Sequence, residues 1–98
     1  MSLEILVTRD AGADIAEALS GFNDISPNLS ERFKEELERV YSYITEYPEI
    51  YPVVYKNFRR GLLRKFPYSV FYIVENSFIL VVGVVHQAQD ESTWKRRA

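Results

Sequence analysis

The chain has 98 residues, of which 47% are hydrophobic and 14% aromatic, and this composition predicts one folded domain over residues 1–98 rather than a disordered chain. The absence of cysteine excludes a disulfide framework and thiolate-bound zinc or iron–sulfur sites, and we expect no cofactor and no metal. The first ten residues lack the basic start and apolar stretch of a signal peptide, and no apolar run is long enough to span a membrane. We therefore expect a cytoplasmic protein that makes no membrane contact.

The net charge of −2 conceals a division of charge between the two halves of the chain. Residues 1–50 carry 4 Lys and Arg against 11 Asp and Glu, a balance of −7, whereas residues 51–98 carry 8 against 3, a balance of +5. Opposite charge is thus segregated along the sequence, so the isoelectric point of the whole chain says little about partners.

The acidic half is predicted to contain a short strand and two helices. Residues 3–7 are rich in β-branched and apolar side chains, which favours a strand. A first helix is expected over residues 10–19, capped by Asp10 and ended by Gly21. Pro27 opens a second helix that Pro48 stops, and the short connection predicts an antiparallel helical hairpin. The second helix has an apolar stripe at helical spacing: Phe33, Leu37, Val40, Tyr41 and Ile44.

The basic half has the pattern of three strands, expected over residues 53–65, 68–75 and 78–86 with a tight turn at residues 75–77. Gly61 inside the first of these indicates a bulge or a close backbone contact. The predicted fold class is α+β with the order β-α-α-β-β-β. In this fold the helical hairpin packs on a small antiparallel sheet, and the first strand pairs at one side of it.

Four motifs follow one another in the second half of the chain. A basic stretch, RRGLLRKFPY, covers residues 59–68, an aromatic strand, FYIV, residues 71–74, an apolar strand, VVGVV, residues 81–85, and HQAQDESTW residues 86–94. This series resembles the RelE/ParE family of toxins from bacterial type II toxin–antitoxin systems, some of which stabilise plasmids. The last motif departs from the family pattern, because Gln89 replaces the usual arginine and Glu91 the usual proline.

The resemblance implies a growth-inhibiting toxin whose partner is a cognate antitoxin protein. A ParE-like toxin acts on DNA gyrase and is neutralised by that antitoxin. The first alternative is a RelE-like endoribonuclease that cuts mRNA on the ribosome, and the second is a non-catalytic module that only binds the antitoxin. The low isoelectric point and Gln89 favour the ParE-like version, and whether the chain is an enzyme stays open.

If the chain is a ribonuclease, the resemblance implies Arg64, His86, Lys56 and Tyr72 as catalytic residues. Arg64 would hold the scissile phosphate, and Lys56, Tyr72 or His86 would move protons. Structural alternatives stand beside these roles. Arg64 is equally suited to an ion pair with a helix carboxylate, and we favour His86 as a brace for the following loop through Asp90.

The residues expected to bind a substrate or partner are Arg59, Arg60, Arg64, Lys65 and Trp94. Strand periodicity places Arg60 and Arg64 on one face and Arg59 and Lys65 on the other. We expect Trp94 to pack back on the sheet as a plug. The cations that follow Trp94, at residues 95–97, are expected to form a solvated tail.

Overall fold

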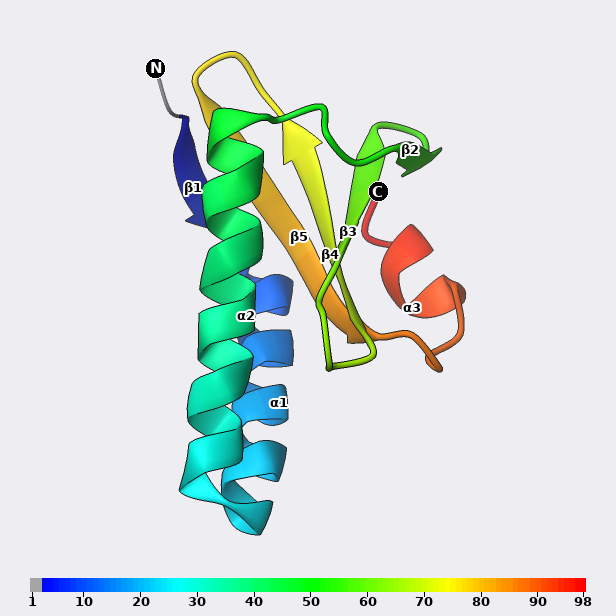
Figure 1. Cartoon of the computed structure of the whole chain (residues 1–98). Coiled ribbons are helices and arrows are strands. Elements are labelled where there is room, and N and C mark those ends of the chain that lie inside the picture. The colour runs from blue at the N-terminus through cyan, green and yellow to red at the C-terminus, as the bar shows by residue number, and fades with distance from the viewer. Residues whose placement is uncertain (1–2) are drawn as a thin grey trace.

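In the computed structural model, which describes residues 3–98, a helical hairpin covers one face of a five-stranded sheet (Figure 1). Helix α1 runs Arg9–Ile25 and helix α2 runs Pro27–Glu46. Only Ser26 separates them, in an extended conformation, and Pro27 occupies the start of α2, where its missing N–H is not needed. The predicted antiparallel hairpin is confirmed. None of the helices in the described residues is apolar enough over enough length to cross a membrane.

Helix α1 is longer at both ends than the sequence predicted. Its N-cap is Thr8, whose hydroxyl accepts a hydrogen bond from the Ala11 N–H at 3.1 Å, so Asp10 lies inside the first turn. Gly21 does not end the helix. The cost of a helical glycine, about 1 kcal/mol, is offset because Phe22 packs with its ring 5.2 Å from that of Phe33.

The sheet has the strand order β1-β5-β4-β3-β2 and is mixed rather than purely antiparallel. Strand β1 (Glu4–Val7) pairs in parallel with β5 (Phe78–His86), which confirms that the first strand joins the sheet at one side. Strands β3 (Phe58–Leu62), β4 (Tyr68–Val74) and β5 form the predicted antiparallel meander.

The long strand predicted over residues 53–65 is wrong, because it divides into β2 (Val53–Tyr55) and β3 and then ends at Leu62. Lys56 adopts a positive φ of 49° in the turn between the two strands, a conformation that strand periodicity does not reveal. Gly61 lies in β3 without a positive φ, and the predicted close contact is confirmed. A Cβ on Gly61 would stand 3.0 Å from the Tyr51 ring.

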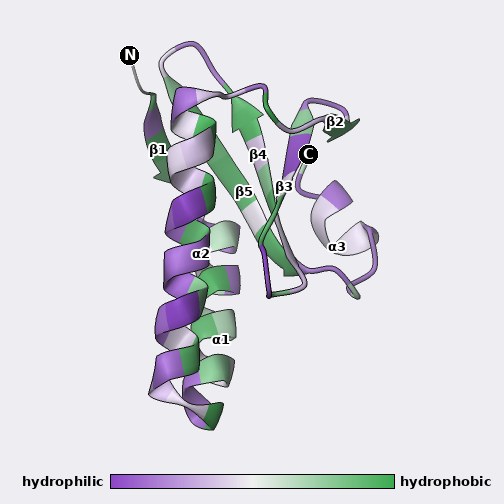
Figure 2. Ribbon diagram, viewed as in Figure 1, coloured by the Kyte–Doolittle hydropathy of each residue, from purple (hydrophilic) through white to green (hydrophobic). Residues whose placement is uncertain are grey.

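The main core fills the space between the hairpin and the sheet. The apolar stripe of α2 is buried there, and the outward side of that helix is polar (Figure 2). Phe22, Phe33, Phe66 and Tyr68 gather at one end, with ring centroids 5.1–5.9 Å apart. This cluster fixes the α1–α2 hairpin against the start of β4.

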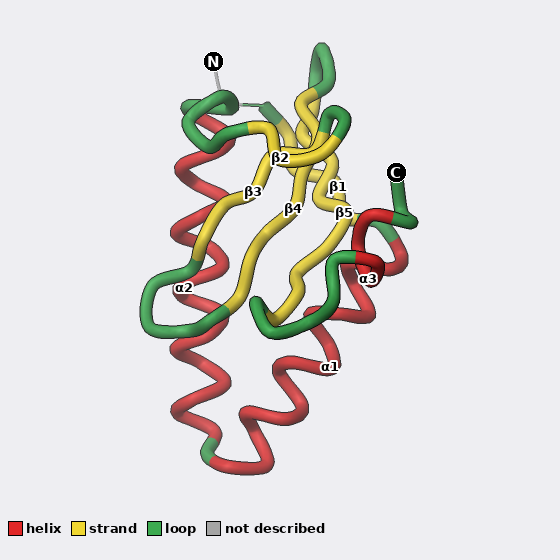
Figure 3. The backbone as a smooth tube through the Cα atoms, turned by 90° about the vertical axis from the view of Figure 1, so that its right-hand side faces the viewer, coloured by secondary structure: helices red, strands yellow, loops and turns green. Residues whose placement is uncertain are grey.

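The opposite face of the sheet is covered by α3 (Ser92–Lys95), as Figure 3 shows from the side of that helix. Trp94 stacks on Phe71 with ring centroids 4.1 Å apart and is 6% exposed. Phe58, Val82 and Val85 complete this second apolar cluster. The predicted packing of Trp94 on the sheet is therefore confirmed. Beside Trp94, part of this sheet face is not covered by α3.

Candidate functional site

A cleft of about 110 Å³ lies between the open part of the sheet and the C-terminal segment. It brings together three of the predicted site residues, Arg60 from β3, His86 from the end of β5 and Trp94 from α3. Gln89 and Glu91 also line it, and the Glu91 carboxylate accepts a hydrogen bond from Lys95 at 2.7 Å. Arg60 is exposed, and a guanidinium and an imidazole that line one cleft are suited to an anionic group such as a phosphate or carboxylate.

The imidazole of His86 is held by the loop that follows β5. Its Nδ1 accepts a hydrogen bond from the Ala88 N–H at 2.9 Å, so the proton of the neutral ring lies on Nε2. The ring also makes an edge contact with Tyr68 at 5.1 Å. His86 therefore braces the loop as expected, but Asp90 is not its partner, because Asp90 accepts a hydrogen bond from the Ser92 N–H. Protonation of Nδ1 would break the contact with Ala88.

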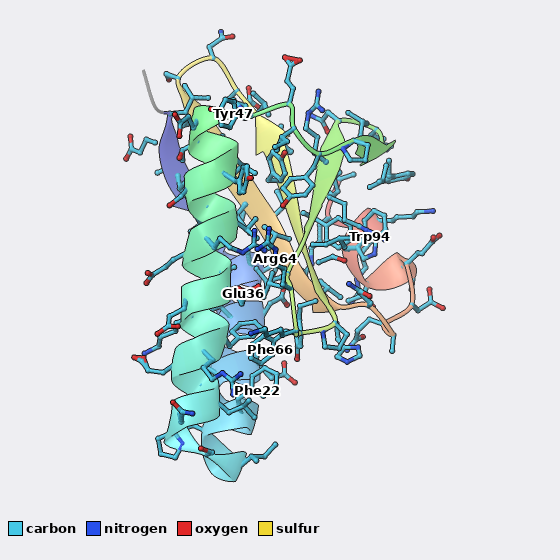
Figure 4. All side chains as sticks on the ribbon, in the orientation of Figure 1. Phe22, Glu36, Tyr47, Arg64, Phe66 and Trp94 are labelled. Carbon is cyan, nitrogen blue, oxygen red and sulfur yellow. The ribbon has the colours of Figure 1, made fainter. Side chains whose placement is uncertain are left out.

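Arg64 lies away from this cleft, on the α2 side of the molecule, beside Glu36 (Figure 4). Strand β3 ends at Leu62, so the predicted two-residue alternation does not reach Arg64, and Lys65 has a positive φ of 65°. The backbone N–H of Arg64 donates to Glu36 Oε1 at 2.7 Å. Burial opposes ionisation of Glu36, but hydrogen bonds from Arg39 and the Arg64 N–H outweigh it and lower the pKa of Glu36.

Tyr72 and Lys56 are not placed for catalysis at this cleft either. Tyr72 is fully buried on the hairpin side of the sheet, and its hydroxyl donates to the Pro48 carbonyl at 2.8 Å. Burial raises the pKa of Tyr72 to about 12. Lys56 lies in the β2–β3 turn, with its ammonium 5.5 Å from the centre of the Tyr55 ring. The predicted catalytic set of Arg64, His86, Lys56 and Tyr72 is thus dispersed over the fold.

The predicted binding residues also separate into different environments. Arg59 donates to the Tyr51 carbonyl at 2.7 Å, which ties the connection after α2 to β3. Trp94 is buried as a plug. Arg60, Arg64 and Lys65 are exposed, and of these only Arg60 lines the cleft that contains His86.

An ion pair between Asp14 and Arg97 was not anticipated from the sequence, which indicated a solvated tail. Arg97 Nη1 lies 2.6 Å from Asp14 Oδ2, and Nη2 lies 3.1 Å from Oδ1. Arg97 also donates to the Val82 carbonyl at 3.0 Å, and Asp14 accepts from the Val84 N–H at 3.0 Å. The hydrogen bonds that Arg97 donates to the Asp14 carboxylate raise the pKa of Arg97 despite its partial burial.

This pair occupies the edge of β5 where the pairing with β1 stops. The register of β1 ends at Val7 opposite Val81, and the β4–β5 register shifts immediately afterwards. Asp14 and Arg97 therefore satisfy backbone groups that a longer β1 would have paired. The two residues are 83 positions apart, so no local pattern in the sequence indicates their contact.

A second cleft, of about 440 Å³, lies between α1 and the end of β5. Glu17, Phe22, Tyr68 and the other side of His86 line it. Burial and the Glu17 carboxylate raise the pKa of Tyr68. Within residues 3–98, no group of three His, Asp or Glu side chains is arranged to hold a metal ion.

Comparison with known proteins identifies the family. The family model described as ParE toxin of type II toxin–antitoxin system, parDE, matches residues 5–91. No curated protein matches the chain. A solved chain described as the chromosomal ParDE toxin–antitoxin system from P. aeruginosa is 16% identical, with a TM-score of 0.74 over 87% of this chain and 96% of that one. That likeness shows the fold. Because the family model spans most of the sequence, the chain belongs to the ParE toxin family of type II toxin–antitoxin systems.

Proposed function

We propose that this toxin acts on DNA gyrase by binding, without acid–base chemistry of its own, and that a cognate antitoxin neutralises it. The observation that carries the proposal is the dispersal of the expected catalytic residues. Tyr72 is buried with its hydroxyl bonded to Pro48, and Arg64 lies against α2 rather than beside His86. Membership of the ParE toxin family supports the same reading.

Cleavage of RNA through its 2′-hydroxyl requires a base, an acid and a stabilising cation around one phosphate. In the Arg60–His86 cleft the cation is present, but only one proton-transfer group of the expected set is available. The Nδ1 of His86 accepts the hydrogen bond from the Ala88 N–H, so only Nε2 is free to contact a substrate. A protein that binds a target enzyme does not need these groups to converge.

The proposal is tested by inducing the toxin alone in a bacterial host and measuring the uptake of labelled thymidine and labelled methionine over the first minutes. We expect thymidine incorporation to fall first, and His86→Ala to remain as toxic as the wild type. An exposed control, Arg96→Ala, reports any general effect of a substitution in the C-terminal segment.

The ribonuclease alternative is favoured by one observation, that Arg60 and His86 line the same small cleft. It predicts that methionine incorporation falls first, and that Arg60→Ala and His86→Ala both abolish growth arrest. A non-catalytic antitoxin-binding module predicts a folded protein that binds the antitoxin and leaves both incorporations unchanged.

A further inference from the structure

An open pocket of about 730 Å³ lies where α2 ends, at the opposite end of that helix from its connection to α1 (Figure 1). Its lining comes from the last turn of α2, the connection to β2, the β4–β5 turn and the residue before β1. Figure 4 labels Tyr47 at this end of α2, well away from Glu36 lower on the same helix and from Trp94 beside α3. We call this hollow the distal pocket. Its main lining residues are Leu3, Glu46, Tyr47, Glu49, Ile50 and Glu75.

The apolar part of the distal pocket is unusually exposed. Tyr47 is 55% exposed and Ile50 48% exposed. Tyr43, one turn earlier on α2, is 40% exposed, and its ring lies 6.4 Å from that of Tyr47. Leu3 and Val74 add less exposed apolar surface to the lining. Large apolar side chains gathered in one exposed hollow indicate a surface that a partner covers.

The rim of the distal pocket is negative. Glu46, Glu49 and Glu75 are exposed, and none of them makes a salt bridge with another described residue. No Lys, Arg or His among residues 3–98 lines this pocket. The last turn of α2 has no basic residue, so the partial negative charge at the helix C-terminus adds to that of the carboxylates. A cationic partner would relieve this repulsion, whereas the phosphates of a nucleic acid would increase it.

We propose that the distal pocket binds a segment of the antitoxin in which an apolar side chain is flanked by Lys or Arg. The apolar side chain fills the hollow against Tyr47 and Ile50, and the cations reach the rim carboxylates. The choice of partner rests on the proposed neutralisation by an antitoxin. It follows from the charge of the rim and from exposed aromatic surface of the kind that carries most of the energy of protein interfaces.

The test measures binding of the purified toxin to its cognate antitoxin, by titration calorimetry. We expect Tyr47→Ala to weaken binding by about tenfold or more, and the double reversal Glu49→Lys, Glu75→Lys to do the same. Glu38→Lys is the matched control, because Glu38 is an exposed acid of α2 that does not line the pocket. All of these side chains are exposed, so the melting temperature of each variant should match the wild type. Reversing a Lys or Arg of the antitoxin segment should restore binding to the Glu49→Lys, Glu75→Lys toxin.

The outcomes separate the two proposals. If both pocket variants bind the antitoxin as tightly as the wild type and the Glu38→Lys control, the distal pocket is not the docking site. If the pocket variants instead abolish self-association of the toxin in gel filtration and leave antitoxin binding intact, the occupant is a second copy, and the proposal is overturned. If the wild-type toxin itself does not bind the antitoxin, the neutralisation proposed above fails.

Discussion

Breaking the ion pair between Asp14 and Arg97 tests whether the C-terminus is part of the folded structure. The two side chains are 18% and 15% exposed, so the pair is screened less than a surface pair but is not fully desolvated. A fully buried pair costs about 3–5 kcal/mol when one partner is removed, and an exposed pair about 0–1 kcal/mol. Arg97→Ala removes three close hydrogen bonds, two to Asp14 and one to the Val82 carbonyl. We therefore expect it to lower the free energy of unfolding by about 2 kcal/mol.

Asp14→Ala should cost more, about 3 kcal/mol, because Arg97 loses two hydrogen bonds and the Val84 N–H loses its acceptor. Arg97 then keeps only the Val82 carbonyl at 3.0 Å and the Asp10 carboxylate at 4.0 Å. For a domain of this size each kcal/mol corresponds to roughly 4–8 °C in melting temperature. Arg97→Ala is thus expected to melt about 8–16 °C below the wild type.

The assay is urea unfolding followed by circular dichroism for the wild type, both single variants and the double variant. The double-mutant cycle should give a coupling of about 1–2 kcal/mol, as expected for residues in contact. Lys95→Ala, which breaks the exposed pair with Glu91, should leave the midpoint unchanged. Additive effects of Asp14→Ala and Arg97→Ala, or a loss no larger than that of Lys95→Ala, would show that the ion pair does not stabilise the fold.

Four further predictions follow from buried groups. Tyr72→Phe should lower the free energy of unfolding by about 1 kcal/mol, because the Pro48 carbonyl loses its donor, and toxicity should persist. Tyr41→Phe should not destabilise the protein, because the Tyr41 hydroxyl is buried with no hydrogen-bond partner in residues 3–98. Urea unfolding midpoints and a growth-arrest assay check both variants. Burial raises the pKa of the Tyr41 and Tyr72 hydroxyls to about 12, above their value near 10 in an unfolded chain. The free energy of unfolding should therefore be intact below pH about 10 and fall towards pH 12, and it should fall less in Tyr72→Phe. Urea unfolding across that pH range measures this dependence. Trp94→Ala should cost about 3 kcal/mol through the lost stacking and raise binding of a dye for exposed apolar surface, whereas unchanged dye fluorescence would contradict the role as a plug. Gly61→Ala should cost about 1–3 kcal/mol in calorimetry, since the added methyl group has no room beside β3.

The elements that the sequence predicted well are those whose signal is local. The apolar stripe of α2 repeats at helical spacing over several turns, and β4 and β5 are dense apolar runs bounded by a short turn. Helix α1 extended past Gly21 because Phe22 meets aromatic side chains from α2 and from the loop before β4. A glycine stops a helix only when tertiary packing beyond it does not compensate.

The candidate site was less predictable, because it depends on where strands end. The motif around Arg64 reads as one long strand, yet β3 stops at Leu62, and the backbone at Arg64 bonds to Glu36 instead of to a neighbouring strand. Whether Arg60 and His86 line the same cleft depends on the β3–β4–β5 register, which the pattern of side chains does not specify. The packing of Trp94 was predictable, because a single tryptophan in a polar segment has few ways to be buried other than against the sheet.

The most direct test of the central claim is to incubate purified toxin with DNA gyrase, ATP and supercoiled plasmid, and to measure linear DNA after denaturation and protease digestion. Linear DNA reports a trapped covalent complex between the enzyme and its cut substrate. We expect wild-type toxin and His86→Ala to produce linear plasmid to the same extent, and added antitoxin to prevent it. No linear DNA from the wild type, together with mRNA cut on ribosomes in a manner that depends on His86 and Arg60, would contradict the proposed action on gyrase.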